Sequence, residues 1–314
     1  MPRASGTSIL CGPDSSRITA CRPVTDPVDH PLVDAHLHLW NPARIRMSWI
    51  DAVPALEGVF EVPDLLQSLG PLASRLAAAV LVESAVDDEA LDDELEWIAA
   101  CLESPGPVRA AVAGWRPFEG ADSVDRRLDV VSGLPGVVGL RHVLHPPDRT
   151  ATDVLDEAHV RAVRRAGERG LLIELCMRPD QLEAAVELVD LAPDTIFVID
   201  HLGRPRTAGT PEIGWREAMG RLAERPRIST KLSALIECAE GSAWDAERFR
   251  PFFDAALAAF GSDRILWGSN WPVCFTDSTP GDWIAAADRL TAGLSESDRA
   301  AIAGGNARRI YRIS

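Results

Sequence analysis

Eight short apolar runs, separated by longer amphipathic stretches, constrain the fold of this 314-residue chain more than any other feature. Several runs are apolar throughout, which is typical of parallel strands that are buried on both faces. The runs lie at residues 32–33, 76–82, 108–113, 137–140, 171–175, 195–199, 227–232 and 265–267. Between the runs, apolar residues recur on one helical face. This spacing predicts helices over residues 87–102, 153–169, 179–191, 215–224 and 246–260.

About eight strand–helix alternations without a long linker favour an α/β fold, a single (β/α)8 TIM barrel. A doubly wound open sheet is the main alternative, since periodicity does not separate the two. No GxGxxG sequence follows the first strand, which disfavours the nucleotide-binding version of that alternative. We expect residues 29–314 to form the barrel domain. Residues 1–28, rich in Ser, Pro, Gly and Asp, are expected to be a flexible N-terminal extension.

The charge of the chain limits its partners. A net charge of −15 argues against nucleic acid or an anionic membrane as the partner, so an anionic substrate needs Arg or Lys inside a pocket. No apolar run approaches the roughly 20 residues that span a bilayer, and the N-terminus lacks the layout of a signal peptide. We therefore expect a cytoplasmic protein that acts on a small molecule, with its oligomeric state left open.

The sharpest local signal is an HxH pair, His36 and His38, at the end of the first strand and after Asp34. Side chains two residues apart on a strand point to the same face. Both imidazoles can therefore converge on one ion or one substrate oxygen. Two ordinary core or surface histidines are the alternative interpretation of the pair.

Polar residues also follow the other apolar runs. Asp200 and His201 end one strand, either as a hydrogen-bonded structural pair or as a held ligand. Asn270 follows the last strand. Weaker signals of the same kind are Glu83, Arg141, His142, Glu174, Lys231 and Ser233. Polar groups that recur at strand ends are typical of barrel enzymes.

The motifs DAHLHLW, AGW, GLRH, IDHLGRP, TKLSAL, GSNWPV and GGNARRIY follow one another along the chain. In this order the chain resembles the amidohydrolase-2 family, in the branch of fuconolactonase-like and pyrone-dicarboxylate lactonase-like enzymes. The resemblance runs from about residue 32 to residue 311. It implies a TIM-barrel hydrolase that opens small lactones or related C–O and C–N bonds, with decarboxylation as an occasional variant.

The resemblance also implies roles for the strand-end residues. His36, His38 and His201 are expected to be metal ligands or groups that polarise the carbonyl. Arg141, His142 and Lys231 are expected to position substrate carboxylate or hydroxyl groups, and Trp40, Glu174 and Ser233 join the substrate-binding set. A divalent ion, zinc in the first place, is one expectation, and a metal-independent mechanism is the other because some relatives work without a metal.

The sequence departs from the family at Asn270, where these lactonases commonly carry Asp. An amide can orient a water but cannot accept its proton. Another base, such as Glu83, Glu174 or His201, would then be needed. We therefore expect a lactone hydrolase in which Asn270 positions water. The alternatives are a decarboxylase or other lyase, and a catalytically weak relative that binds a metabolite.

Overall fold

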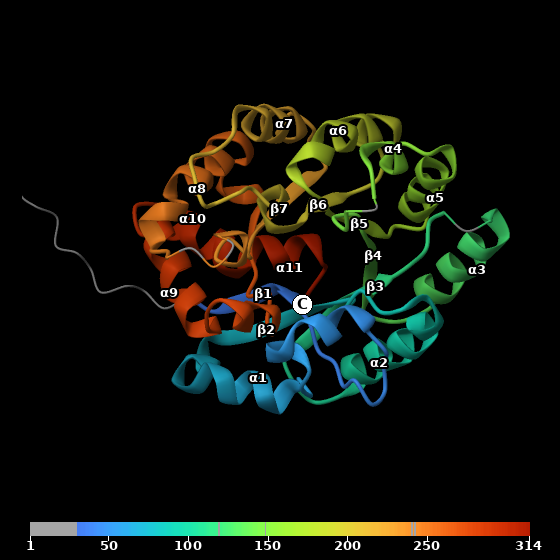
Figure 1. Ribbon diagram of the computed structural model, residues 1–314, viewed down its shortest axis with the longest axis horizontal. Coiled ribbons are helices and arrows are strands. Elements are labelled where there is room, and N and C mark those ends of the chain that lie inside the picture. The colour runs from blue at the N-terminus through green and yellow to red at the C-terminus, as the bar shows by residue number, and fades with distance from the viewer. Residues whose placement is uncertain (1–29, 119, 148, 240, 242) are drawn as a thin grey trace, which may run out of the picture.

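The continuously apolar runs form eight parallel strands that pair in chain order around a barrel. The computed structural model describes residues 30–118, 120–147, 149–239, 241 and 243–314. The strands are β1 (Leu32–Leu37), β2 (Leu76–Val82), β3 (Val108–Gly114), β4 (Val137–Val143), β5 (Leu172–Cys176), β6 (Phe197–Ile199), β7 (Ile228–Leu232) and β8 (Ile265–Trp267). Each overlaps a predicted run, and helices surround the barrel (Figure 1).

Backbone hydrogen bonds beyond β8 close the barrel against β1. The N–H of Asn270 donates to the carbonyl of His36 over 2.9 Å, and the N–H of His38 donates to the carbonyl of Trp271 over 2.8 Å. Closure removes the open edges that a doubly wound sheet would have. The predicted barrel is therefore confirmed, and the open-sheet alternative is wrong.

The outer layer holds five helices that the sequence predicted and others that it did not. The α-helices of the described residues are α1 (Val62–Leu69), α2 (Leu91–Glu103), α3 (Ala121–Ser132), α4 (Ala151–Val154), α5 (Glu157–Glu168), α6 (Leu182–Leu191), α7 (Ile213–Ala223), α8 (Ala246–Phe260), α9 (Pro280–Thr291), α10 (Glu296–Ala300) and α11 (Asn306–Ile310). The predicted helix over 153–169 is broken into α4 and α5. The break occurs where Asp156 caps α5, its side chain accepting from the N–H of Ala158 over 2.8 Å.

The C-terminal segment packs against one part of the barrel core. Ala307, Ile310, Tyr311 and Ile313 join a buried cluster with small apolar side chains of the strands, among them Ala78. In Figure 1, α11 lies across the middle of the barrel. The last residues of the chain are therefore part of the core that supports the strands.

None of the helices in the described residues is long and apolar enough to cross a membrane. The predicted extension over residues 1–28 lies outside the described part of the chain.

Candidate functional site

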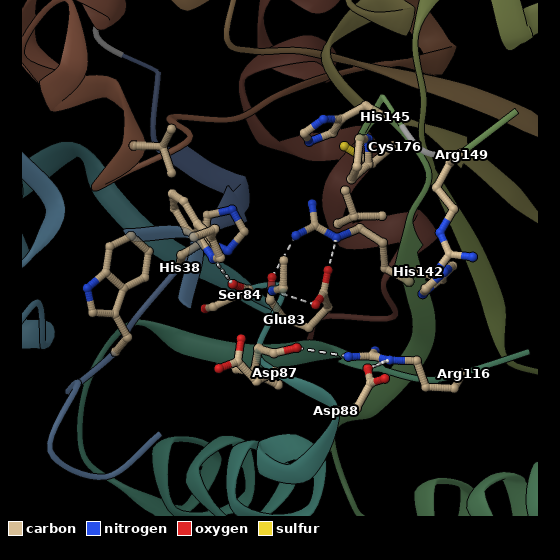
Figure 2. A pocket seen from close by; sticks show the side chains of 18 of the residues that line it. His38, Glu83, Ser84, Asp87, Asp88, Arg116, His142, His145, Arg149 and Cys176 are labelled. Atoms are coloured by element: carbon tan, nitrogen blue, oxygen red, sulfur yellow. Dashed lines mark hydrogen bonds and ion pairs between the residues drawn. The ribbon is translucent and has the colours of Figure 1, made fainter. Parts of the chain in front are cut away.

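A cavity of about 710 Å³ lies at the carboxyl ends of the strands. His38, Glu83, Arg141, His142, His201 and Asn270 line it, and Figure 2 shows several of these side chains. Each of them stands in the last residues of a strand or in the loop that follows. The predicted strand-end residues therefore meet at one place, which is where TIM barrels carry their sites.

The two histidines of the HxH pair converge. Their Nε2 atoms lie 3.1 Å apart, and both residues are buried. Nδ1 of His38 lies 3.0 Å from the carbonyl of Val82 and must donate there, because a carbonyl only accepts. The lone pair of His38 Nε2 therefore points toward His36, which suits a shared ion or a hydrogen bond between the rings.

A tight turn after β6 brings Asp200 and His201 to the same place. His201, Leu202 and Arg204 all have positive φ, an uncommon conformation outside glycine that often marks functional turns. Nδ1 of His201 contacts Oγ of Ser233 at 2.7 Å, and its ring centroid lies 4.5 Å from that of His36. One ligand atom from each of His36, Asp200 and His201 lies within 4.8 Å of the others.

Lys231 lies at the centre of a fully buried polar network beneath the histidines. Its Nζ lies 2.6 Å from Oε2 of Glu174, 2.9 Å from Oδ1 of Asp200 and 2.9 Å from Nδ1 of His36. The hydroxyl of Tyr311 donates to Oε1 of Glu174 over 2.5 Å. Burial raises the pKa of Glu174 to about 7 although Lys231 opposes the shift. Lys231 and Glu174 do not line the cavity, so their predicted contact with substrate stays a prediction.

Arg141 joins this network to the cavity wall. Its Nε donates to Oε1 of Glu83 over 2.5 Å, and its Nη1 lies 3.1 Å from Oδ2 of Asp200 and 3.2 Å from Nε2 of His36. Burial alone would raise the pKa of Asp200. Lys231, His36 and Arg141 together hold that pKa well below its usual value, so Asp200 is an anion.

Burial favours the neutral form of the four histidines of the site, of which His36 lies beneath the cavity and does not line it. Burial lowers the pKa of His38 and of His142 to about 3, and it holds the pKa values of His36 and His201 well below the ordinary value. Neutral imidazoles keep a lone pair for a metal ion or a hydrogen bond. Nε2 of His142 is buried without a hydrogen-bond partner in the described residues.

The donor set fits a divalent ion. Three neutral imidazoles and the Asp200 carboxylate are ligand types that zinc uses, and His38 has the carbonyl partner that commonly orients a metal-binding histidine. Arg141 and Lys231 lie close to His36 and work against a cation there. Glu83 and Asp200 offset these two cations, and Glu174, whose pKa is about 7, adds a further negative charge when it is ionised.

Asn270 has a carboxylate neighbour that the strand-end pattern missed. Its Nδ2 donates to Oε1 of Glu237 over 2.8 Å. Glu237 is half-buried, and burial raises its pKa to about 7. It lies in a short 3-10 turn (Glu237–Ala239), five residues beyond the end of β7. Only its place in a buried stretch after the TKLSAL motif could have marked it in the sequence.

The aromatic segment from Trp40 to Phe60 both lines the cavity and packs against itself. Trp40 and Trp49 line the cavity. The Trp40 ring contacts Trp49 and Phe60 edge to face, with centroids 5.9 Å and 5.5 Å away. Nε1 of Trp49 donates to the carbonyl of Ser84 over 2.9 Å, which ties the loop to the segment after β2.

Comparison with known proteins places this site in a family. The family model described as Amidohydrolase matches residues 33–313, which is most of the chain. The resemblance inferred from the motifs is therefore confirmed.

Individual relatives agree with this match. An L-fucono-1,5-lactonase of Burkholderia ambifaria is 30% identical over 90% of this chain and 95% of its own length. The crystal structure of an amidohydrolase from Burkholderia multivorans with bound zinc is 27% identical, with a TM-score of 0.78 over 90% of this chain and 99% of that one. The structure of a 2-pyrone-4,6-dicarboxylic acid hydrolase, assigned as putative, from Pseudomonas putida shares the fold, at 24% identity and a TM-score of 0.68 over 90% of this chain and 98% of that one.

Proposed function

The chain belongs to the amidohydrolase family, and we propose that it opens the ring of a small lactone by hydrolysis. The observation that carries the proposal is the convergence of His36, His38 and His201 with Arg141 at the floor of the cavity. The Burkholderia lactonase among its relatives supports a cyclic ester as the substrate class.

A divalent ion, zinc in the first place, is part of the proposal. His36, His38 and His201 would hold it, with the Asp200 carboxylate as an additional donor. When bound, the ion supplies Lewis acidity for the lactone carbonyl. The zinc-bound Burkholderia structure supports this assignment.

The chain's own residues stabilise the negative charge that develops on the carbonyl oxygen. Nη1 of Arg141 lies near His36 and Asp200 at the cavity floor, held by the two hydrogen bonds that its other nitrogens make to Glu83. A donor that is fixed before the reaction contributes about 3 kcal/mol to such an oxyanion. Three buried residues position the histidines. Lys231, itself paired with Glu174, holds His36, and Ser233 holds His201.

Glu237 does not itself line the cavity, but it contacts Asn270, which does, and we propose it as the proton acceptor that Asn270 cannot be. The amide of Asn270 is oriented by its bond to Glu237, which leaves Oδ1 to hold the attacking water. The water oxygen bonds to the carbonyl carbon while Glu237 takes its proton. The ring C–O bond then breaks, and the proton passes to the leaving alkoxide to give a hydroxy acid. A pKa of about 7 suits this transfer at neutral pH.

The other carboxylates suit this role less well. Glu83 is paired with Arg141, and Glu174 is paired with Lys231 below the cavity. Trp40 and His142 complete the substrate wall.

A screen of neutral and carboxylated lactones with a pH indicator, with metal content measured on the same sample, tests the proposal. We expect acid release with one lactone class and a loss of rate of about a hundredfold or more in His38→Ala. His159→Ala is the matched control, because His159 is also buried but lies on α5 outside the site. Normal turnover in a folded His38→Ala protein would contradict the assignment.

A decarboxylase or other lyase is the second candidate, favoured by Asn270 in place of the expected Asp. Such an enzyme would release CO2 from a carboxylated ring without taking up water. A metabolite-binding relative without turnover would bind lactones and leave them intact. Gas release and product analysis in the same screen separate these two outcomes from hydrolysis.

A further inference from the structure

We propose that Glu94 is a positioning residue, which holds the turn after β2 so that Glu83 keeps Arg141 aimed at the reacting carbonyl. The inference rests on the proposed function for the role of Arg141, whereas the contact between Glu94 and the turn does not depend on it. Glu94 lies on α2, in the layer around the barrel, and does not line the cavity. It would therefore act on the reaction through the turn, without touching the substrate.

Glu94 is the polar exception on the buried face of α2. The other buried residues of this helix are Leu95, Trp97 and Ile98. Glu94 is 1% exposed, and its Oε1 accepts from the N–H of Ser84 over 2.6 Å. A carboxyl group loses its hydration at such a depth, and one hydrogen bond from the backbone replaces only part of it. A glutamate at this position destabilises the fold relative to a leucine, which points to a role that an apolar side chain would not fill.

The turn that Glu94 holds is strained and carries the groups that orient Arg141. Ala85 has a φ of 51°, a conformation that residues with a side chain rarely adopt. Its N–H donates to Oε2 of Glu83 over 2.7 Å. Oε1 and the carbonyl of Glu83 accept from Nε and Nη2 of Arg141 over 2.5 Å and 2.6 Å. Because Ser84 lies between Glu83 and Ala85, the bond from its N–H to Glu94 fixes the middle of this turn.

The residue that Glu94 holds also supports the aromatic wall of the cavity. The carbonyl of Ser84 accepts from Nε1 of Trp49 over 2.9 Å, and both residues line the cavity. Figure 2 shows Ser84 beside Glu83 at the cavity. One carboxyl group outside the cavity therefore reaches two parts of its lining through the backbone of a single residue.

The second oxygen of Glu94 lies in a closed space behind the strand ends. Oε2 is buried and has no hydrogen-bond partner among the described residues. A Cβ atom at Gly114, the last residue of β3, would lie 2.8 Å from this oxygen and 3.6 Å from Cβ of Glu83. The two glutamates therefore meet over Gly114, which leaves room for both because it has no side chain.

The surroundings of Glu94 favour its neutral form at pH 7. Burial in the first place, and then the negative charge of Glu83, raise its pKa to about 8, although the positive charges of Arg141 and Arg127 oppose the shift. Arg127 is itself engaged, since its Nη2 donates to the carbonyl of Gly114 over 2.9 Å. Once Glu94 is ionised, a second carboxylate stands near Glu83, repels it and competes with it for Arg141.

Two substitutions separate the position of Glu94 from its charge. Glu94→Gln keeps an acceptor for the N–H of Ser84 and cannot ionise, whereas Glu94→Leu removes the acceptor. With a lactone that wild type hydrolyses, Glu94→Leu should lower kcat by about tenfold to a hundredfold and change KM less than about threefold, because a displaced Arg141 acts on the transition state. Glu94→Gln should keep kcat within about threefold at pH 7 and lose the fall in rate that we expect in wild type above about pH 8. Glu96→Gln is the matched control, since Glu96 is exposed on the same helix.

The side-chain Nε–H signal of Arg141 tests the positioning role without turnover. In proton–nitrogen correlation spectra it is assigned by its absence in Arg141→Lys. We expect this signal to shift in a step at about pH 8 in wild type and to lack that step in Glu94→Gln.

The two measurements distinguish the two proposals. The expected step without hydrolysis of any lactone would overturn the hydrolase and support the hold of Glu94 on the Glu83–Arg141 pair. The same step in folded Glu94→Gln as in wild type, or undiminished kcat in folded Glu94→Leu, would overturn the positioning role, whatever the lactone screen gives.

Discussion

Asn270 and Glu237 form a hydrogen-bonded amide–carboxylate pair at the end of β8, with 2.8 Å between Nδ2 and Oε1. In the proposed mechanism the pair supplies the carboxylate that Asn270 itself lacks. The negative charge of Asp277 raises the pKa of Glu237, and the positive charge of Arg204 lowers it.

Glu237→Gln should lower kcat by about a hundredfold or more, because a general base contributes a factor of this size. In the wild-type chain the base must be ionised, so the rate should rise with pH through about 7, the pKa of Glu237. This rise, the acid limb of the pH–rate profile, should be absent in Glu237→Gln. Because the charge of Asp277 helps to raise this pKa, Asp277→Asn should move the limb to lower pH. A pH–rate profile checks both statements, and an unaltered limb in Glu237→Gln would remove Glu237 as the base.

The same variant should gain stability at high pH. The folded state raises the pKa of Glu237 from 4.5 to about 7, so it binds the proton better than the unfolded chain does. The stabilisation from that proton is complete below about pH 4.5 and is lost as pH rises through 7. Glutamine keeps an acceptor for Asn270 and carries no charge. Melting curves should therefore place Tm of Glu237→Gln above wild type at pH 9 and close to it at pH 5. Equal shifts at both pH values would contradict this origin.

Moving the carboxylate across the pair tests the amide–carboxylate relationship directly. Asn270→Asp alone sets two carboxylates side by side, and their repulsion should raise the pH of the acid limb. Asn270→Asp combined with Glu237→Gln restores one carboxylate and one amide with exchanged positions. We expect the double variant to recover activity that Glu237→Gln loses, measured as kcat/KM on the same lactone. A double variant no better than Glu237→Gln would mean that Glu237 acts from its own position only.

Much of the fold and part of the site could be predicted from the sequence, for identifiable physical reasons. Strands buried on both faces leave unbroken apolar runs, and parallel strands end at one face of a barrel. His38 and His201 could therefore be assigned to one face of the barrel from the sequence. Glu237 could not, because it lies in an irregular turn that no periodicity marks. The burial of Lys231 could not be predicted either, because it depends on side chains from β5, from the turn after β6 and from the C-terminal segment.

Tyr311 illustrates the same limit, because its partner Glu174 lies 137 residues earlier in the chain. Helical and strand patterns describe neighbours along one element and say nothing of a contact between a C-terminal segment and the barrel floor.

Loss of this long-range contact should weaken both the fold and the site. Tyr311→Phe keeps the buried ring and removes the donor to Oε1 of Glu174, which leaves a buried acceptor unsatisfied. Such a group costs about 1–3 kcal/mol of unfolding free energy, which denaturant titration measures. Ser262→Ala is a suitable control, because it removes a hydroxyl whose partner, Asp298, is half-buried and not fully buried as Glu174 is. An unchanged unfolding free energy in Tyr311→Phe would show that Glu174 finds another donor.

The histidine cluster should bind a divalent ion whether or not the protein is active, so the metal content of the purified chain can be predicted. We expect the purified chain to hold about one divalent ion, and His38→Ala to lose most of it, because three imidazoles bind zinc far better than two. Ser233→Ala should retain the ion with lower affinity, since it removes only the partner that orients His201. Elemental analysis after dialysis against chelators of increasing strength ranks the three proteins by their affinity for the ion. Equal metal content in wild type and His38→Ala would place the ion elsewhere, and an absence of metal in an active wild-type enzyme would leave Arg141 as the main group that polarises the carbonyl.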